Sequence, residues 1–168
     1  RAGYAAVATT GRLPFSLFLM RIRITKEHGG PRLLCTRRDG SHTQGDLGPT
    51  LPQHDLAHYV VERELHLTQG FFGLIAAGHS IGELNDPATI RTLPAEALAA
   101  EVLTRALQGL SNGAVAQSDF RSVVEAEGIR VPKGLTDEVV TRMLGTYVTL
   151  LNQWESVPEG AALELRWM

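Results

Sequence analysis

Residues 52–78 read PQHDLAHYVVERELHLTQGFFGLIAAG, and the rest of the chain is organised around this stretch. Pro52 suits the first turn of a helix, where its missing N–H is not needed, and Asp55 suits the positive end of the helix dipole. We therefore predict a helix from about Pro52 to Leu67. The segment GFFGLIAAG after it is apolar on all sides, which predicts a second, buried helix with Phe71 and Phe72 in the core.

Two histidines of the first helix favour a metal site. With 100° between successive residues, His54 and His58 lie about 40° apart on the helix surface, and Glu62 lies about 40° further on. The spacing His-x-x-x-His places two imidazoles one turn apart, which is the geometry of helical zinc sites. We predict a divalent-metal site, such as zinc, with His54, His58 and Glu62 as candidate ligands. His79, just after the second helix, is a remote candidate ligand.

Asp55 follows the first histidine, at the position that the general base occupies in the metalloprotease motif HExxH. Its side chain is one methylene shorter than that of glutamate. We take Asp55 as a candidate base or as a residue that orients an imidazole. In the alternative interpretation it is only a first-turn acid, and His54 and His58 are hydrogen-bonded residues at the border of the core. Glu64 falls among apolar positions, and we expect it to meet a basic partner at the helix edge.

Two resemblances bear on the same residues. The adjacent pair His54-Asp55 resembles the His-Asp metal phosphohydrolases, which implies further His and Asp ligands on other helices. The segment HDLAHYVVE, followed by GFFGLIAAG, resembles a group of small uncharacterised bacterial proteins that carry HDLxHYxVE. That resemblance covers the chain from Met20 onward and implies that His54, Asp55, His58 and Glu62 are signature positions. It implies no particular activity.

Patterns on both sides of the helix predict a sheet. Met20–Lys26 alternates apolar and polar residues, as a half-buried strand does, and Arg32–Arg38 and Ser41–Gln44 are expected to be strands two and three, joined by the hairpin signal Asp39-Gly40. Ala161–Trp167 alternates again and is expected to pair with the first strand. Cross-strand ion pairs are expected on the outer face among Arg21, Arg23, Glu164 and Arg166.

The predicted fold class is α+β, with a small antiparallel sheet, made of the N-terminal meander and the C-terminal strand, packed on a block of about five helices. Residues 82–93 are expected to be irregular apart from one short turn at Asp86-Pro87. We predict a single α+β domain over residues 20–168. Because MRIRITK opens a clean strand pattern, residues 1–19 are expected to be a non-native or poorly structured extension.

Composition limits the classes of function. The chain has 168 residues, 43% of them hydrophobic and 20% charged, and its net charge of −2 gives no electrostatic reason to expect nucleic acid or an anionic membrane as a partner. No apolar run reaches the length of a membrane span. The single cysteine, Cys35, fits a reducing compartment, so we expect a cytoplasmic protein with Cys35 in its core.

Two hypotheses about function remain open. The first is a small metal-binding protein, in its more specific form a metal-dependent hydrolase of unidentified small-molecule substrate, and it requires further ligands that converge on His54 and His58 from other elements. The second is a non-enzymatic interaction or regulatory domain that binds no metal. It predicts an exposed apolar patch for a protein partner or for a second copy of the chain.

Overall fold

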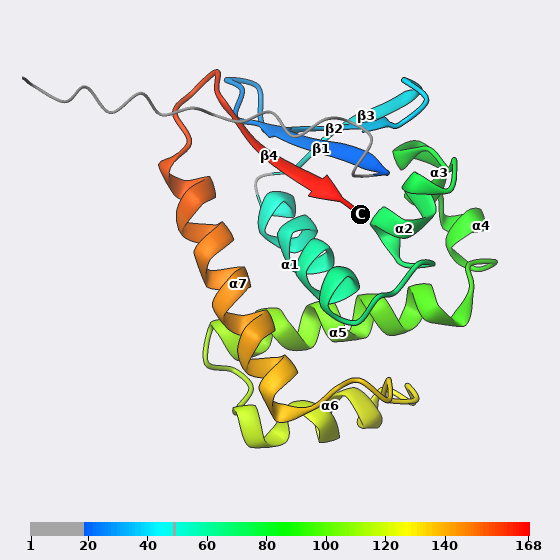
Figure 1. The fold of residues 1–168 in the computed structure, drawn as a ribbon, viewed down its shortest axis with the longest axis vertical. Helices are drawn as coiled ribbons and strands as arrows, with labels where there is room; N and C mark the ends of the chain where they lie inside the picture. The colour runs from blue at the N-terminus through cyan, green and yellow to red at the C-terminus, as the bar shows by residue number, and fades with distance from the viewer. Residues whose placement is uncertain (1–18, 49) are drawn as a thin grey trace, which may run out of the picture.

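A computed structural model of the chain describes residues 19–48 and 50–168 (Figure 1). The predicted extension, residues 1–19, therefore lies outside the described residues except for Leu19. Four strands form one antiparallel sheet in the order β3-β2-β1-β4. Their bounds are Met20–Thr25 for β1, Arg32–Arg37 for β2, His42–Asp46 for β3 and Ala162–Trp167 for β4. The predicted sheet, built from both ends of the chain, is confirmed.

Strand β1 is central because it pairs with β2 on one side and with β4 on the other. Ile22 faces Cys35 in one pair and Leu165 in the other, and all three side chains are buried. On the opposite face Arg23 is paired with Glu164, and Nη1 of the arginine lies 3.6 Å from Oε1 of the glutamate. The expected alternation, with an apolar inner face and a cross-strand ion pair outside, is thus confirmed.

The helices lie on one side of the sheet, with α1 between the sheet and α5 (Figure 1). Within the described residues the α-helices are α1 (Leu51–Glu64), α2 (Phe71–Ala76), α3 (Ile81–Leu84), α4 (Pro87–Ile90), α5 (Ala95–Ser111), α6 (Phe120–Ala126) and α7 (Asp137–Ser156). A short 3-10 helix, Gln117–Asp119, precedes α6. The α+β class is confirmed.

Two local predictions were wrong. Helix α1 ends at Glu64 rather than near Leu67, because His66 adopts a left-handed backbone conformation with φ of 53°, which a helix cannot continue through. Residues 82–93 are also more regular than expected. Ser80 and Glu83 form a capping box, in which each side chain bonds to the other residue's backbone N–H, and this stabilises α3.

Buried side chains from the sheet and from the helices form one hydrophobic cluster around α1. The Tyr59 hydroxyl donates to the backbone oxygen of Arg166 at 3.0 Å, and the Tyr147 hydroxyl donates to that of Gln53 at 3.1 Å. These bonds fix α1 against β4 and α7. Cys35 lies in the core as predicted, where burial raises the pKa of its thiol to about 12.

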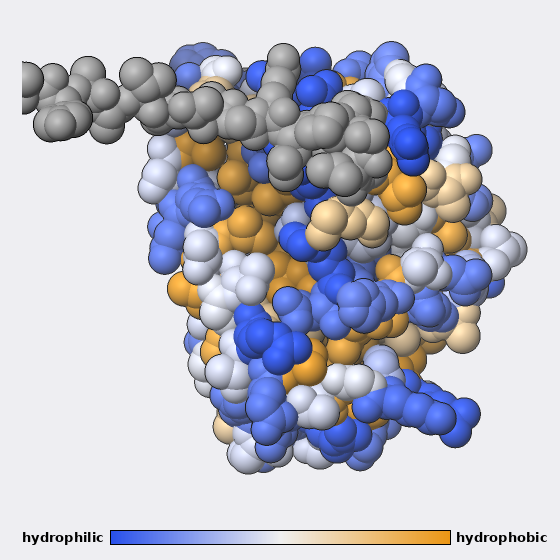
Figure 2. All heavy atoms as spheres, viewed as in Figure 1, coloured by the Kyte–Doolittle hydropathy of each residue, from blue (hydrophilic) through white to orange (hydrophobic). Residues whose placement is uncertain are grey.

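The visible face of the molecule carries both polar and hydrophobic residues. In Figure 2, polar residues predominate at the lower end of the molecule, and hydrophobic residues are visible between the sheet and α7.

Glu64, at the end of α1, has the basic partner that its position predicts. Nε of Arg142 in α7 lies 3.2 Å from Oε2 of Glu64. Among the described helices, none has both the length and the apolar character needed to cross a bilayer.

Candidate metal centre

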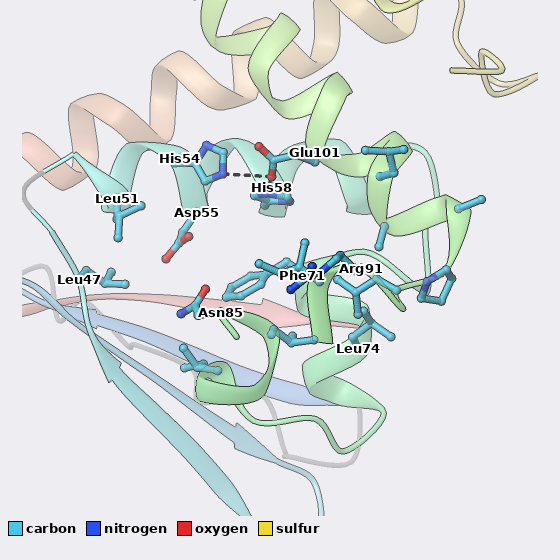
Figure 3. Close-up of a pocket in the computed structure, with 18 residues that line it drawn as sticks. Leu47, Leu51, His54, Asp55, His58, Phe71, Leu74, Asn85, Arg91 and Glu101 are labelled. Atoms are coloured by element: carbon cyan, nitrogen blue, oxygen red, sulfur yellow. Dashed lines mark hydrogen bonds and ion pairs between the residues drawn. The ribbon is translucent and has the colours of Figure 1, made fainter. Parts of the chain in front are cut away.

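Two histidines of α1 and one glutamate of α5 meet at the wall of a pocket (Figure 3). The Nε2 atom of His58 lies 3.1 Å from Oε2 of Glu101, and the Nε2 atom of His54 lies 3.4 Å from the same oxygen. The two imidazole rings are one helical turn apart, with their centroids 4.7 Å from each other and their planes at 80°. One carboxylate oxygen is thus shared by two ring nitrogens.

The opposite nitrogen of each imidazole is also bonded. Nδ1 of His54 lies 3.0 Å from the side-chain oxygen of Gln108, and Nδ1 of His58 lies 3.1 Å from Oε1 of Glu62. Both partners are oxygen acceptors, so each Nδ1 must carry a hydrogen and donate it. This fixes the orientation of both rings and leaves each Nε2 to face Glu101. Metal-binding histidines are held in the same way in known sites.

Glu62 lies at the junction of α1 and α2, and its side chain is fully buried. Besides the bond from His58, its Oε2 atom accepts the backbone N–H of Gly73 at 3.1 Å. A Cβ atom added at Gly70 would overlap the Glu62 carboxyl group. The absence of a side chain at Gly70 therefore allows the chain to approach this carboxylate closely.

The electrostatics of the cluster favour positively charged imidazoles when no metal is bound. Burial alone lowers the pKa of His58, but hydrogen bonds to Glu101 and Glu62 outweigh it and raise the pKa to about 9. The bond to Glu101 likewise raises the pKa of His54, against the effect of its partial burial. In return, the bonds from His54 and His58 hold the pKa of Glu101 far below its usual range. The carboxylate and the two imidazoles therefore favour one another's charged forms.

This arrangement could hold a metal ion. One ring nitrogen from each of His54 and His58 and one carboxylate oxygen of Glu101 all lie within 4.8 Å of one another. Ligand atoms about 2.0–2.2 Å from a tetrahedral zinc ion are roughly 3.3 Å apart, close to the two nitrogen–oxygen distances above. Two histidines and one glutamate are also a ligand set that catalytic zinc sites use, with the fourth position open. A divalent ion can replace the protons that the two Nε2 atoms share with Glu101.

Asp55 lies beside this group but does not belong to it. Its carboxyl group points into the pocket in Figure 3, and only 5% of the residue is exposed. Its Oδ2 atom has no hydrogen-bond partner among the described residues. Burial raises the pKa of Asp55 to about 7, although His58 and His54 act in the opposite direction. Gln108 and Glu62, not Asp55, contact the Nδ1 atoms, so Asp55 does not orient either imidazole through that nitrogen.

The pocket in front of these groups has a volume of about 650 Å³. Its walls come from the segment before α1 and from α1 to α5, and most of them are apolar: Leu47, Leu51, Phe71, Leu74, Ile81, Leu84, Ile90, Leu93, Ala97 and Leu98. Asn85 and Arg91 add polar groups to the lining. Phe72 lies in the core as predicted, but Phe71 is only half-buried and lines the pocket, 5.7 Å from the His58 ring.

The structure brings together only part of the predicted ligand set. His54 and His58 converge, whereas Glu62 reaches the far side of the His58 ring and orients it. His79 is exposed just after α2 and does not line the pocket. Glu101 was not predicted as a ligand. The sequence does contain a signal for it, because Glu101, Thr104 and Gln108 place polar groups at helical spacing on the side of α5 that meets α1.

No protein-family model matches the chain, and no curated protein or solved structure is significantly similar to it. The resemblance to bacterial proteins with an HDLxHYxVE segment stays a prediction.

Proposed function

We propose that this protein binds one divalent metal ion, with zinc as the best fit, through His54, His58 and Glu101, and that it hydrolyses a small molecule held in the adjoining pocket. One observation carries the proposal. One ring nitrogen from each of His54 and His58 and one carboxylate oxygen of Glu101 lie within 4.8 Å of one another, while Gln108 and Glu62 lie within hydrogen-bond distance of the Nδ1 atoms. Anchored imidazoles on a pocket wall are the arrangement that catalytic zinc sites require.

The other residues have distinct roles in this proposal. A zinc ion held by His54, His58 and Glu101 would supply Lewis-acid chemistry that makes water nucleophilic near neutral pH. Asp55 is the base, because burial in the same pocket brings its pKa to about 7, where a carboxylate can both accept and return a proton. Phe71 and the leucine side chains exclude bulk water from these groups, which strengthens every electrostatic interaction between them.

The distribution of exposed apolar side chains supports a small-molecule site over an interaction domain. Among the large hydrophobic residues that are exposed in the described parts of the chain, Leu51, Ile90 and Leu98 line the pocket. They are 41%, 51% and 57% exposed, so they surround its mouth. A concave site with an apolar lining and a few converging polar groups is typical of small-molecule binding.

Metal content is the first test. Untagged protein purified without chelators is compared by elemental analysis with the Glu101→Gln variant and the His54→Ala/His58→Ala double variant. We expect close to one equivalent of zinc or another divalent metal in the wild type and a loss of it in both variants. His79→Ala is the matched control and should retain the metal. If the wild type contains no metal and takes up none in a calorimetric titration, the proposed site is rejected.

Hydrolysis is tested separately, with acyl p-nitroanilides of four to ten carbon atoms as chromogenic substrates. Activity should depend on the metal and fall at least a hundredfold in Asp55→Asn, which keeps the metal ligands. If metal is bound but no substrate of this panel or of a matching ester panel is cleaved, the protein is a metal-binding protein without this activity.

A further inference from the structure

The volume and the lining of the pocket beside the candidate metal site indicate which class of substrate fits it. Its volume of about 650 Å³ is within the range of small-molecule sites and holds a molecule of medium size. Aliphatic side chains cover most of the wall, and the polar groups gather in two places. Asp55, His54, His58 and Glu101 lie on one wall, and Figure 3 shows Asn85 and Arg91 among the residues that face them.

Asp55 is the feature that points to a ligand. A buried carboxylate oxygen without a hydrogen bond destabilises the folded state. Such oxygens are uncommon in folded proteins and call for an explanation. Oδ2 of Asp55 is in this situation within the described residues, and the carboxyl group points into the cavity. A ligand that donates a hydrogen bond to this oxygen would satisfy it.

The surroundings of Asp55 decide which kind of donor fits. The titratable groups that act on it are His58, His54, Glu62 and Glu101. Most of the remaining pocket wall is aliphatic, so an ammonium donor would lose its hydration there. A neutral N–H donor is buried at a lower cost. An amide also carries a carbonyl oxygen, which the side-chain amide of Asn85 or the metal can bind.

We propose that the pocket binds a carboxamide whose apolar acyl or aryl body lies among the leucine side chains and whose N–H donates to Asp55. The inference deepens the proposed function, since it names an amide as the bond to be cleaved. In turnover the water oxygen bonds to the carbonyl carbon and the carbon–nitrogen bond breaks. The water proton passes through Asp55 to the departing nitrogen, so the products are a carboxylic acid and an amine. Binding of the amide, however, does not require the metal.

The experiment uses a matched pair of probes, N-methyloctanamide and methyl octanoate, which differ only in an N–H that replaces an oxygen. Their dissociation constants are measured by calorimetry with the full chain, as purified and after removal of metal by a chelator. We expect the amide to bind at least tenfold more tightly than the ester in both states, because a site built for a donor rejects the analogue without it. In Asp55→Leu the ratio should fall to near one.

Two further measurements make the result decisive. Ala97→Phe fills the pocket and should abolish binding of both probes, whereas Ala126→Phe on the exposed end of α6 should not. Equal or tighter binding of the ester by the wild type would overturn the proposal. So would binding that Asp55→Leu leaves unchanged, or binding of neither probe. Amide binding by a protein that takes up no metal would support the amide site and reject the metal-dependent function. Metal uptake by a protein that does not prefer the amide would reject the amide site and support metal binding.

Discussion

The Nδ1 atom of His58 lies 3.1 Å from the Oε1 atom of Glu62, one helical turn further along α1. Because a carboxylate can only accept, this bond places a hydrogen on Nδ1 and turns Nε2 toward Glu101, where its neighbour His54 also points. The glutamate of the HDLAHYVVE segment therefore orients a candidate ligand, and the glutamate that completes the candidate group comes from α5.

Glu62→Gln should weaken zinc binding by ten- to a hundredfold, which is the usual effect of removing a partner that orients a metal-binding histidine. The amide is a weaker acceptor for Nδ1–H, so the His58 ring loses part of its orientation and basicity. A competition titration against a chromogenic zinc chelator measures the change. Glu125→Gln, at an exposed position on α6, is the control and should bind zinc like the wild type. An unchanged affinity in Glu62→Gln would mean that the bond does not support the site.

The metal-free protein should lose stability as the pH rises from about 6.5 to 9. His58 has an ordinary pKa of 6.5 and a pKa of about 9 in the fold, so the folded state holds its proton more tightly. The contribution of His58 to the free energy of unfolding is fully present below pH 6.5 and is lost as the pH rises through 9. The shift corresponds to a loss on the order of 3 kcal/mol. Urea unfolding at several pH values measures it, and His58→Gln should flatten the curve.

Asp55→Leu should stabilise the protein, and more strongly at pH 8 than at pH 5. Burial raises the pKa of Asp55 from 3.8 to about 7, so its favourable contribution is present below pH 3.8 and is lost as the pH rises through 7. The gain at pH 8 should exceed the gain at pH 5 by on the order of 2 kcal/mol. The difference in unfolding free energy from the wild type, taken at each pH, measures this effect together with the interaction between Asp55 and His58. Equal gains at both pH values would contradict it.

Gly73→Ala should destabilise the fold severely, whereas Gly145→Ala should not. A Cβ atom at Gly73 would overlap the backbone carbonyl of Thr68, which cannot move without shifting α2 and its bond to Glu62. At Gly145, in the middle of α7, a Cβ atom meets no heavy atom within 4 Å, and alanine should stabilise the helix by about 0.5–1 kcal/mol. Thermal unfolding of both variants provides the comparison. A Gly73→Ala protein as stable as the wild type would show that this contact can relax.

The sequence by itself determined the elements and the layer that each of them forms. Alternation in Met20–Lys26 and Ala161–Trp167 predicts the two paired strands, because a period of two residues places one face in the core. The same kind of argument placed Cys35 inside and found the two histidines one turn apart. These are local relationships, set by the geometry of a strand or a helix.

Only the tertiary structure decided which groups meet in the site. Glu101 is 43 residues from His58 along the chain and reaches it because α5 packs across α1. The same packing brings Gln108 to His54, and the close approach of α2 at Gly73 directs Glu62 away from the pocket. The spacing along one helix fixes only the angles between side chains of that helix. The identity of the third ligand and the unpaired oxygen of Asp55 depend on how neighbouring helices pack.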